Sequence, residues 1–215
     1  MEVPTILELR ELVAAVAARG GRVRVSLSPL PDGAAASLTV VVVAAAADAT
    51  ALARTVVGLA KPVSGRVMVG PRDVTDLPPG SRQLGYLPAG GALLPHLTVR
   101  QNIEYLLWRR ESVHEIIRGW EAALIHQLEL GPVLDQRPHE ITAQQRMRAA
   151  LARAVVSLPE VLIMERPDPT ATGPLRPLLA RVGSAATAGP ATVVFTETTA
   201  AVDDTAPDRL IHAVV

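Results

Sequence analysis

The stretch VVVAAAADATALARTVVGL (residues 41–59) reads as the end of a β-strand that passes directly into an α-helix. Its valines continue the β-branched run SLTVVVV (37–43), which is typical of a strand buried on both faces. The residues that recur at helical spacing after it, and that predict one apolar helix face, are Leu52, Thr55, Val56 and Leu59. The connecting AAAADAT contains neither glycine nor lysine. We therefore expect residues 46–50 to begin the helix, with Asp48 complementing the helix dipole in the first turn.

The composition predicts a soluble protein of one domain, or of one domain with a subdomain. The chain has 215 residues, of which 49% are hydrophobic and only 2% aromatic, so alanine, valine and leucine must fill the core. A formal net charge of +0 gives no electrostatic reason to expect nucleic acid, and the lack of cysteine excludes disulfides and thiolate metal sites. The N-terminus does not fit a signal peptide, and the apolar run 38–47 is about half as long as a membrane-spanning helix, so we expect a cytoplasmic location.

Strands and helices alternate along the chain, which predicts an α/β fold with a mostly parallel sheet. The further strand-like runs are 66–69, 84–88, 161–165 and 191–197. The segments 98–130 and 142–156 read as helical and suggest a helical subdomain inserted at about residues 90–157. Prolines punctuate residues 167–177, and DDTAPDRL (203–210) reads as a solvated turn before a final strand.

The helical segments contain candidate packing residues. Trp108 and Trp120 read as anchors of the first segment. The residues predicted to share one buried face of 142–156 are Met147, Ala150, Leu151, Ala154 and Val155. The histidines show no metal-ligand spacing, so we expect surface or packing roles for His96, His114, His126, His139 and His212.

Three segments resemble the nucleotide-binding subunit of ATP-binding cassette transporters. They are VSGRVMVGPRDVTDLPPGSRQLGYL (63–87), LPHLTVRQNI (94–103) and PHEITAQQRMRAALARAVVSLPEVLIMERP (138–167), and they are most similar to the importer group. The resemblance covers about residues 5–212 and implies a single nucleotide-binding domain over residues 1–215. It also implies a P-loop NTPase-like core with a mostly parallel sheet, an N-terminal antiparallel β region and the inserted helical subdomain.

The phosphate loop of this family, G-x-x-G-x-G-K-[ST], aligns with residues 43–50 and is replaced there. In the family, backbone N–H groups of the loop cradle phosphates and the lysine reaches the β- and γ-phosphates. The residues at the three glycine positions, the lysine position and the hydroxyl position are Val43, Ala46, Asp48, Ala49 and Thr50. Asp48 puts a negative charge where phosphate would lie, and two like charges about 4 Å apart repel by about 1 kcal/mol in water. Only Thr50 keeps its type, since the family uses a hydroxyl there to hold magnesium.

Other family positions with catalytic or binding roles are also replaced. The glutamine that senses magnesium falls at Ala89, and the switch histidine falls at Glu197. The acidic pair that ends the Asp–Glu strand reads Glu165–Arg166. Glu165 could still hold a metal, whereas Arg166 cannot act as a general base because its guanidinium stays protonated. The ring that stacks on adenine is expected near Val16, where the sequence has no aromatic residue.

The family signature L-S-G-G-Q reads ITAQQ (141–145). Thr142 keeps a hydroxyl and Gln145 keeps the glutamine. Ala143 and Gln144 replace the glycines, and their side chains should obstruct the approach of a partner's γ-phosphate. Thr142 and Gln145 also fit a capping box, T-x-x-Q before an apolar helical run, so they are either helix caps or a surviving signature contact.

Two further polar features allow structural as well as functional interpretations. Thr50 fits a hydroxyl in the first turn of a helix as well as a magnesium ligand. Glu165–Arg166 fits a local ion pair or a contact with a partner as well as a catalytic dyad.

The replacements predict a degenerate cassette subunit, a structural or regulatory partner that no longer hydrolyses ATP and needs no cofactor. The resemblance implies a membrane permease that docks near residues 89–99 and the helical subdomain, with the chain peripheral on the inner membrane face. It also implies a homodimer, or a heterodimer with an active cassette subunit. Two alternatives stay open: a cassette that binds ATP and magnesium weakly or hydrolyses ATP slowly through Glu165 with Arg54 or Arg166, and a soluble interaction module.

Overall fold

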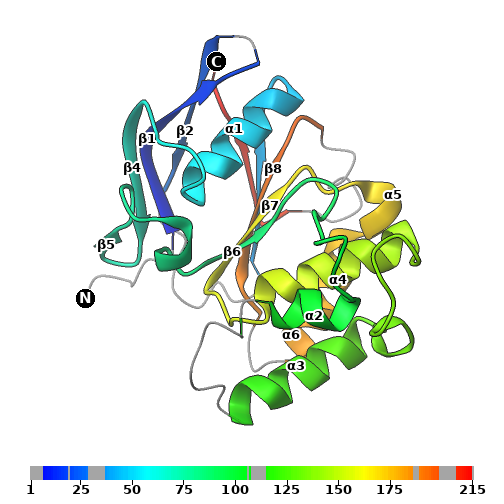
Figure 1. Ribbon diagram of the computed structural model, residues 1–215. Helices are drawn as coiled ribbons and strands as arrows, with labels where there is room; N and C mark the ends of the chain where they lie inside the picture. Colours follow the sequence, from blue (N-terminus) through cyan, green and yellow to red (C-terminus); the bar gives the residue numbers. More distant parts are fainter. Residues whose placement is uncertain are drawn as a thin grey trace.

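The chain contains a parallel and an antiparallel β-sheet (Figure 1). The computed structural model describes residues 7–18, 20–28, 37–105, 107, 115–185, 189–198 and 207–214. The strands are β1 (Leu7–Val16), β2 (Gly21–Leu27), β3 (Leu38–Val42), β4 (Ser64–Val69), β5 (Arg72–Asp73), β6 (Leu84–Leu87), β7 (Val161–Glu165), β8 (Ala191–Thr196) and β9 (Arg209–His212). The helices are α1 (Ala46–Val56), α2 (Val99–Glu104), α3 (Glu115–Gln127), α4 (Ala143–Val155), α5 (Pro169–Thr172) and α6 (Leu175–Ala185), with 3₁₀ turns at η1 (Pro79–Ser81) and η2 (Gly131–Val133).

The larger sheet is parallel and the smaller one antiparallel. The five-stranded sheet has the order β6-β7-β8-β3-β9, and every neighbouring pair runs parallel. The four-stranded sheet has the order β2-β1-β4-β5 and is antiparallel throughout. Reciprocal backbone hydrogen bonds between Arg24 and Val214 join β2 to the residues that follow β9. The prediction of an α/β fold with a mostly parallel sheet and an N-terminal antiparallel region is confirmed.

Helix α1 lies between the two sheets and begins at Ala46, as predicted (Figure 1). Its buried face, which includes Leu52 and Val56, packs against β1 and β2 on one side and β7 and β8 on the other. The prediction that this face continues to Leu59 is wrong. The helix ends at Val56, Gly58 adopts a left-handed φ of +86°, and Leu59 is 49% exposed.

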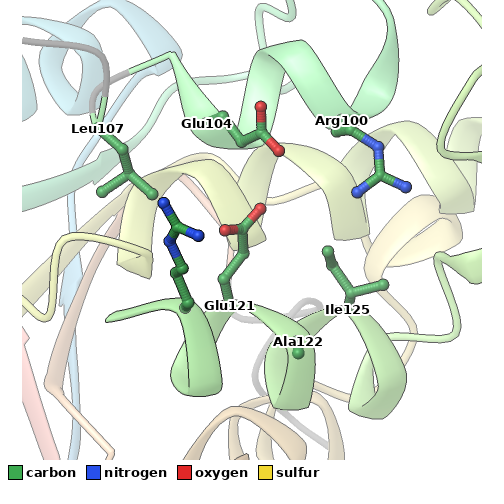
Figure 2. A pocket seen from close by; sticks show the side chains of 7 residues that line it. Arg100, Glu104, Leu107, Glu121, Ala122 and Ile125 are labelled. Carbon is green, nitrogen blue, oxygen red and sulfur yellow. The ribbon is translucent and has the colours of Figure 1, made fainter. Parts of the chain in front are cut away.

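The helical segment predicted over 98–130 forms two separate helices, α2 and α3. Both α2 and α4 begin with a capping box, at Thr98 and Thr142 respectively. A pocket opens between α2 and α3 (Figure 2). The extent of an inserted helical subdomain, about residues 90–157, stays a prediction. None of the helices in the described ranges is long and apolar enough to cross a membrane.

The predicted packing residues of these helices are largely confirmed. Trp120 of α3 is buried, and its Nε1–H donates to the Val155 carbonyl at 3.3 Å. The predicted face of α4 is buried at all five positions, which are Met147, Ala150, Leu151, Ala154 and Val155. Trp108 and His114 lie outside the described residues.

The structure describes the segment 167–177 and part of the segment 203–210. The proline-punctuated segment 167–177 contains α5 and the start of α6. Pro177 is tolerated in the first turn of α6, because a first-turn N–H has no partner within the helix. Within 203–210, residues 203–206 lie outside the described part, but Asp208 is held in place because it accepts a hydrogen bond from Leu38 N–H at 2.7 Å. The predicted final strand is present as β9.

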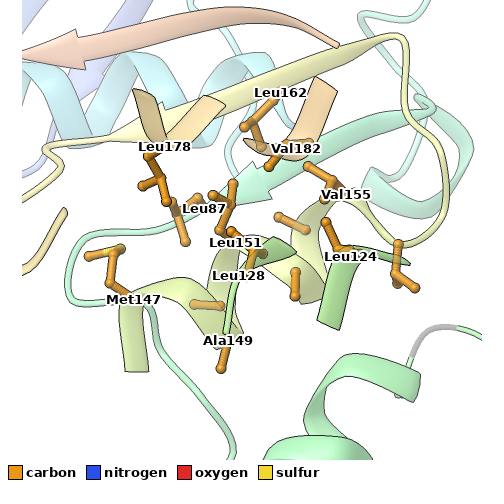
Figure 3. Packing of buried hydrophobic residues seen from close by; sticks show 14 of the residues in the cluster. Leu87, Leu124, Leu128, Met147, Ala149, Leu151, Val155, Leu162, Leu178 and Val182 are labelled. Atoms are coloured by element: carbon orange, nitrogen blue, oxygen red, sulfur yellow. The ribbon is translucent and has the colours of Figure 1, made fainter. Parts of the chain in front are cut away.

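The parallel sheet divides the apolar core into two layers, one of which is shown in Figure 3. Side chains alternate between the layers along each strand. In β7, Leu162 and Met164 join the layer formed with α3, α4 and α6, whereas Val161 and Ile163 join the layer that contains α1. Both faces of the sheet are therefore covered, which explains its nearly unbroken apolar strands.

Arg82 is a buried arginine that the sequence did not reveal. Its side chain is 2% exposed and donates only to carbonyl groups in the described structure. The acceptors and distances are the carbonyls of Leu77 at 2.8 Å, Thr55 at 3.0 Å, Val56 at 2.8 Å and Thr75 at 2.6 Å. Burial lowers the pKa of its guanidinium. Arg82 thus satisfies carbonyls at the C-terminal end of α1, where a helix leaves its acceptors unpaired.

Candidate functional site

The carboxyl ends of four parallel strands meet at one edge of the five-stranded sheet. The candidate residues at these ends are Val43 after β3, Ala89 after β6, Glu165 in β7 and Glu197 after β8. The pairing of β3 with β8 continues to this edge, since Val43 N–H donates to the Thr196 carbonyl at 3.0 Å. Open α/β sheets bind their ligands at this edge. It is therefore the candidate functional site.

The connection between β3 and α1 is short, and its last residue, Ala45, is extended. Residues 43–45 alone separate the strand from the helix, and no residue of 43–50 has a positive φ. The Ala45 carbonyl accepts from the N–H groups of Asp48 at 2.9 Å and Ala49 at 3.3 Å. These amides are therefore used within the first helical turn. Asp48 lies in that turn as predicted and is fully buried.

Glu165 accepts hydrogen bonds at both of its carboxylate oxygens. The Thr50 hydroxyl of α1 donates to Oε1 at 2.6 Å, and the Tyr86 hydroxyl of β6 donates to Oε2. Burial raises the pKa of the Tyr86 phenol, and its hydrogen bond to Glu165 raises it further. Thr50 is the fifth residue of α1, one position beyond the first turn that one interpretation proposed, and its hydroxyl donates to a carboxylate on a strand.

The start of α1 lacks the cation that the family uses to hold a triphosphate. Thr50 and Glu165 are oxygen donors of the kind that magnesium prefers, but they are bonded to each other. No group of three or more His, Asp or Glu side chains in the described ranges is arranged to hold a metal ion. A triphosphate also needs cations, of which residues 43–50 supply none, and the N–H groups of Asp48 and Ala49 are already bonded to the Ala45 carbonyl.

Arg166 and Glu197 form a bidentate ion pair across the ends of β7 and β8. Arg166 Nε lies 2.9 Å from Glu197 Oε2, and Arg166 Nη2 lies 2.9 Å from Oε1. The Arg166 backbone adopts a left-handed φ of +43°, which is rare for a residue with a side chain. The hydrogen bonds from Arg166 lower the pKa of Glu197. The predicted local ion pair between Glu165 and Arg166 is wrong, because each residue bonds a different partner.

We expect the Arg166–Glu197 pair to be worth about 0.5–1 kcal/mol in a double-mutant cycle with alanine, since both side chains are partly exposed. Pairing lowers the pKa of Glu197 from its ordinary value of 4.5, so this stabilisation is complete above pH 4.5 and is lost as the pH falls through the lowered pKa. Urea unfolding at about pH 7 and pH 3 measures the coupling. The more exposed pair Arg66–Asp73, at 3.7 Å, is the control, with a smaller coupling expected. A coupling that grows toward low pH would contradict this assignment.

The segment that follows β6 is held by two polar side chains from other helices. Arg153 of α4 donates to the carbonyls of Gly91 at 2.8 Å and Ala92 at 3.0 Å. Asn102 of α2 is fully buried, accepts from Leu94 N–H at 2.8 Å, and donates to carbonyls of the same segment. These hydrogen bonds therefore hold the backbone of the segment that begins near Ala89 in one conformation.

Thr142 and Gln145 form the predicted capping box at the start of α4. The Thr142 hydroxyl accepts from Gln145 N–H at 3.2 Å, and the Gln145 side-chain oxygen accepts from Thr142 N–H at 2.9 Å. Ala143 and Gln144 follow the cap and are exposed. Thr142 and Gln145, the two residues retained from the signature, are thus hydrogen-bonded to each other.

Comparison with known proteins decides the family. The sequence model described as "ABC transporter" matches residues 49–169, more than half of the chain. The chain belongs to the ABC transporter family. The match begins at the fourth residue of α1 and ends four residues after β7, so it includes Thr50 and Glu165.

Several relatives of the chain are import ATP-binding proteins. The chain is 36% identical over 114 residues to the spermidine/putrescine import ATP-binding protein PotA of Frankia alni, covering 53% of this chain and 24% of that protein. It is 40% identical over 118 residues to the sn-glycerol-3-phosphate import ATP-binding protein UgpC 3 of Rhizobium etli, covering 54% and 33%. The molybdate/tungstate import ATP-binding protein WtpC of Archaeoglobus fulgidus is 38% identical over 112 residues, covering 52% and 46%. These matches span less than half of each relative.

Solved ABC structures share the fold at low sequence identity. CbiO1 of Clostridium perfringens, part of the transporter complex CbiONQ, superposes with a TM-score of 0.73 at 18% identity, over 99% of this chain and 88% of that chain. The dimeric structure of MJ0796, a bacterial ABC transporter cassette, gives a TM-score of 0.75 at 17% identity, over 96% and 94%. The ABC cassette fold is confirmed over nearly the whole chain.

The structure brings some of the ABC motif positions into direct contact. It connects Thr50 with Glu165, and Arg166 with Glu197, by direct hydrogen bonds. Val16, at the expected adenine-stacking position, is 1% exposed in β1 and so presents no surface to a base. Sequence reasoning missed Tyr86 and Asn102, although both lie within segments quoted for the resemblance. For Tyr86 the signal was a hydroxyl inside the apolar run 84–88, which requires a partner once the run is buried.

Proposed function

We propose that the chain is a degenerate ABC cassette subunit, a pseudo-ATPase that serves as a structural or regulatory partner of a membrane permease, of an active cassette subunit, or of both. The Arg166–Glu197 ion pair is the observation that carries this proposal. It joins the positions of the family's catalytic base and switch histidine to each other. Because a guanidinium does not accept a proton, Arg166 cannot activate a water. The Glu197 carboxylate already accepts hydrogen bonds from Arg166.

The start of α1 supports the same proposal. Phosphoryl transfer depends mainly on positioning the phosphates and neutralising their charge. Ala49 offers no cation at the lysine position, and Asp48 adds a negative charge in the same turn. The N–H groups of both residues are already bonded to Ala45. The chain therefore lacks the groups that would hold a triphosphate at this turn.

The same replacements limit what a dimer could do. In the family, each composite ATP site combines the phosphate loop of one chain with the signature of the other. A homodimer of this chain would have no intact site, and a heterodimer with an active cassette subunit would have at best one impaired site. A cassette of this kind would support a complex structurally without hydrolysing ATP. The pairing of Thr142 with Gln145 fits this role, since it stabilises a helix.

We place the permease contact on the segment 89–99 and on helices α2 to α4. These helices would form the inserted helical subdomain, about residues 90–157, within one domain that spans residues 1–215. Asn102 and Arg153 support the placement because they give the segment 89–99 a defined course. The protein would then be cytoplasmic and peripheral on the inner face of the membrane.

A phosphate-release assay and co-purification test the proposal. We expect no ATP turnover above buffer, and no gain in nucleotide binding or turnover for the double variant Ala49→Lys/Arg166→Glu, because the phosphate loop geometry itself is absent. Turnover at a rate usual for the family would overturn the proposal. Co-purification from the native host separates the two roles. A permease among the partners supports a transport complex, whereas soluble partners alone support an interaction module on a cassette scaffold.

A further inference from the structure

The pocket between α2 and α3 has a volume of about 430 Å³ and an apolar floor that includes Leu107 and Ile125 (Figure 2). Helix α2 packs against α4, whereas α3 packs against α6, so the two helices are held by different neighbours. The side chains that reach across the pocket can therefore join α2 to α3 or leave them separate. The charged ones are Arg100 and Glu104 of α2, and Arg118 and Glu121 of α3.

Glu104 and Glu121 face each other across the pocket and form a hydrogen bond between their carboxyl groups (Figure 2). Such a bond needs one proton, because an ionised carboxylate can only accept. Burial raises the pKa of Glu121, and the charge of Glu104 and the hydrogen bond with it raise this pKa further. The structure therefore shows the pair in the form that holds a proton.

Each carboxyl group has a second partner available on its own helix. Arg100 precedes Glu104 by four residues and Arg118 precedes Glu121 by three, which are the spacings at which side chains of one helix meet. Both arginines lower the pKa of Glu121, although its net shift is upward. Arg100 also lies near Asp135, with 4.0 Å between its Nε and a carboxylate oxygen that is almost fully exposed. An ionised pair is therefore compensated by arginines within each helix.

We propose that Glu104 and Glu121 form a proton-dependent latch, a contact that joins α2 to α3 only while the pair holds a proton. When the proton is lost, each carboxylate pairs with the arginine of its own helix, and the two helices separate at the pocket. Charge is compensated in both arrangements, which allows both to be populated. The inference goes beyond the proposed function, because the latch does not depend on whether the chain uses ATP.

The direction of the pH dependence follows from the groups that act on Glu121. Glu104 favours its protonated form, whereas Arg100 and Arg118 favour its ionised form, and the net effect raises its pKa above the ordinary value of 4.5. The contribution of the latch to stability is therefore complete below about pH 4.5 and is lost as the pH rises through the raised pKa. We expect the helices to be joined in acid and released toward neutral pH.

Methyl NMR on the full chain tests the latch. Leu107 is 3% exposed and Ile125 is partly buried, so relaxation of their methyl groups by a soluble gadolinium chelate reports access to the pocket floor. We expect this relaxation to rise about twofold or more between about pH 4.5 and pH 8, with the same midpoint as the titration of the Glu121 side-chain carbon. Arg100→Ala and Arg118→Ala should each move the midpoint upward, because the ionised form loses a partner.

Two glutamine variants complete the experiment. Glu121→Gln keeps a hydrogen-bond donor for Glu104 but has no proton to lose, so its methyl relaxation should stay low across the pH range. Glu160→Gln removes an exposed carboxylate elsewhere and should leave the midpoint unchanged. The latch is refuted if Glu121 titrates at or below 4.5, if the midpoint persists in Glu121→Gln, or if the arginine variants lower it. ATP turnover by the chain would refute the proposed function alone, and leave the latch standing.

Discussion

Replacing Arg82 with alanine is expected to lower the free energy of unfolding by about 3–5 kcal/mol, the range for breaking a buried hydrogen-bond network around a charge. Four carbonyls lose their charged donor, and two of them end helix α1. The Arg82 side chain packs directly on Gly58, since a Cβ at this position would lie 2.5 Å from Arg82 Nε. Urea denaturation followed by circular dichroism measures the loss.

Two variants make the Arg82 prediction specific. Arg82→Lys keeps the charge, but one ammonium group cannot replace a guanidinium fork that reaches four carbonyls, so an intermediate loss is expected. Arg72→Ala removes an exposed arginine that donates to Gln83, and should cost less than about 0.5 kcal/mol. If Arg82→Ala were as stable as Arg72→Ala, the buried network would not hold α1 in place.

Replacing Asn102 with alanine is expected to cost about 2–3 kcal/mol, since buried partners are left unsatisfied. Asn102 is fully buried and pairs with both the N–H and the carbonyl of Leu94. Its loss frees the segment that follows Ala89, which the proposed function assigns to permease contact. Hydrogen exchange at Leu94 N–H should accelerate in this variant much more than exchange in β7.

Asn102→Asp is the matched control for this segment. It keeps the oxygen that accepts from Leu94 N–H, but it replaces a donor with a carboxylate oxygen facing the carbonyls of Leu97 and Thr98. We expect this variant to be less stable than the unaltered chain because its carboxylate faces two carbonyls, with part of the cost offset by Arg153, whose Nη1 lies 3.4 Å from Asn102 Oδ1. Equal exchange rates at Leu94 in all three proteins would show that Asn102 does not order the segment.

Periodicity and residue type were sufficient to predict most of the fold. The β-branched run 37–43 became the buried strand β3, and 142–156 became α4 with its predicted face inside. These predictions succeeded because local pattern and tertiary environment agree in these elements. The fold also confirmed the resemblance to the ABC family. The alignment of several segments constrains the topology, which periodicity alone leaves open.

The polar pairs of the candidate site were out of reach of sequence reasoning. Arg166 and Glu197 are separated by 31 positions, and they meet because β7 and β8 are neighbours in the sheet. Thr50 and Glu165 are separated by 115 positions. Sequence proximity therefore suggested the wrong partner for Glu165. Long-range pairs depend on strand order, which residue spacing does not encode.

Isothermal titration of the purified chain with Mg-ATP is the most direct test of the central claim that this ABC cassette does not use ATP. We expect no heat of binding at micromolar to millimolar nucleotide, because the turn at Asp48 and Ala49 is closed within α1 and Arg166 is bonded to Glu197. Micromolar Mg-ATP binding accompanied by turnover would contradict the claim.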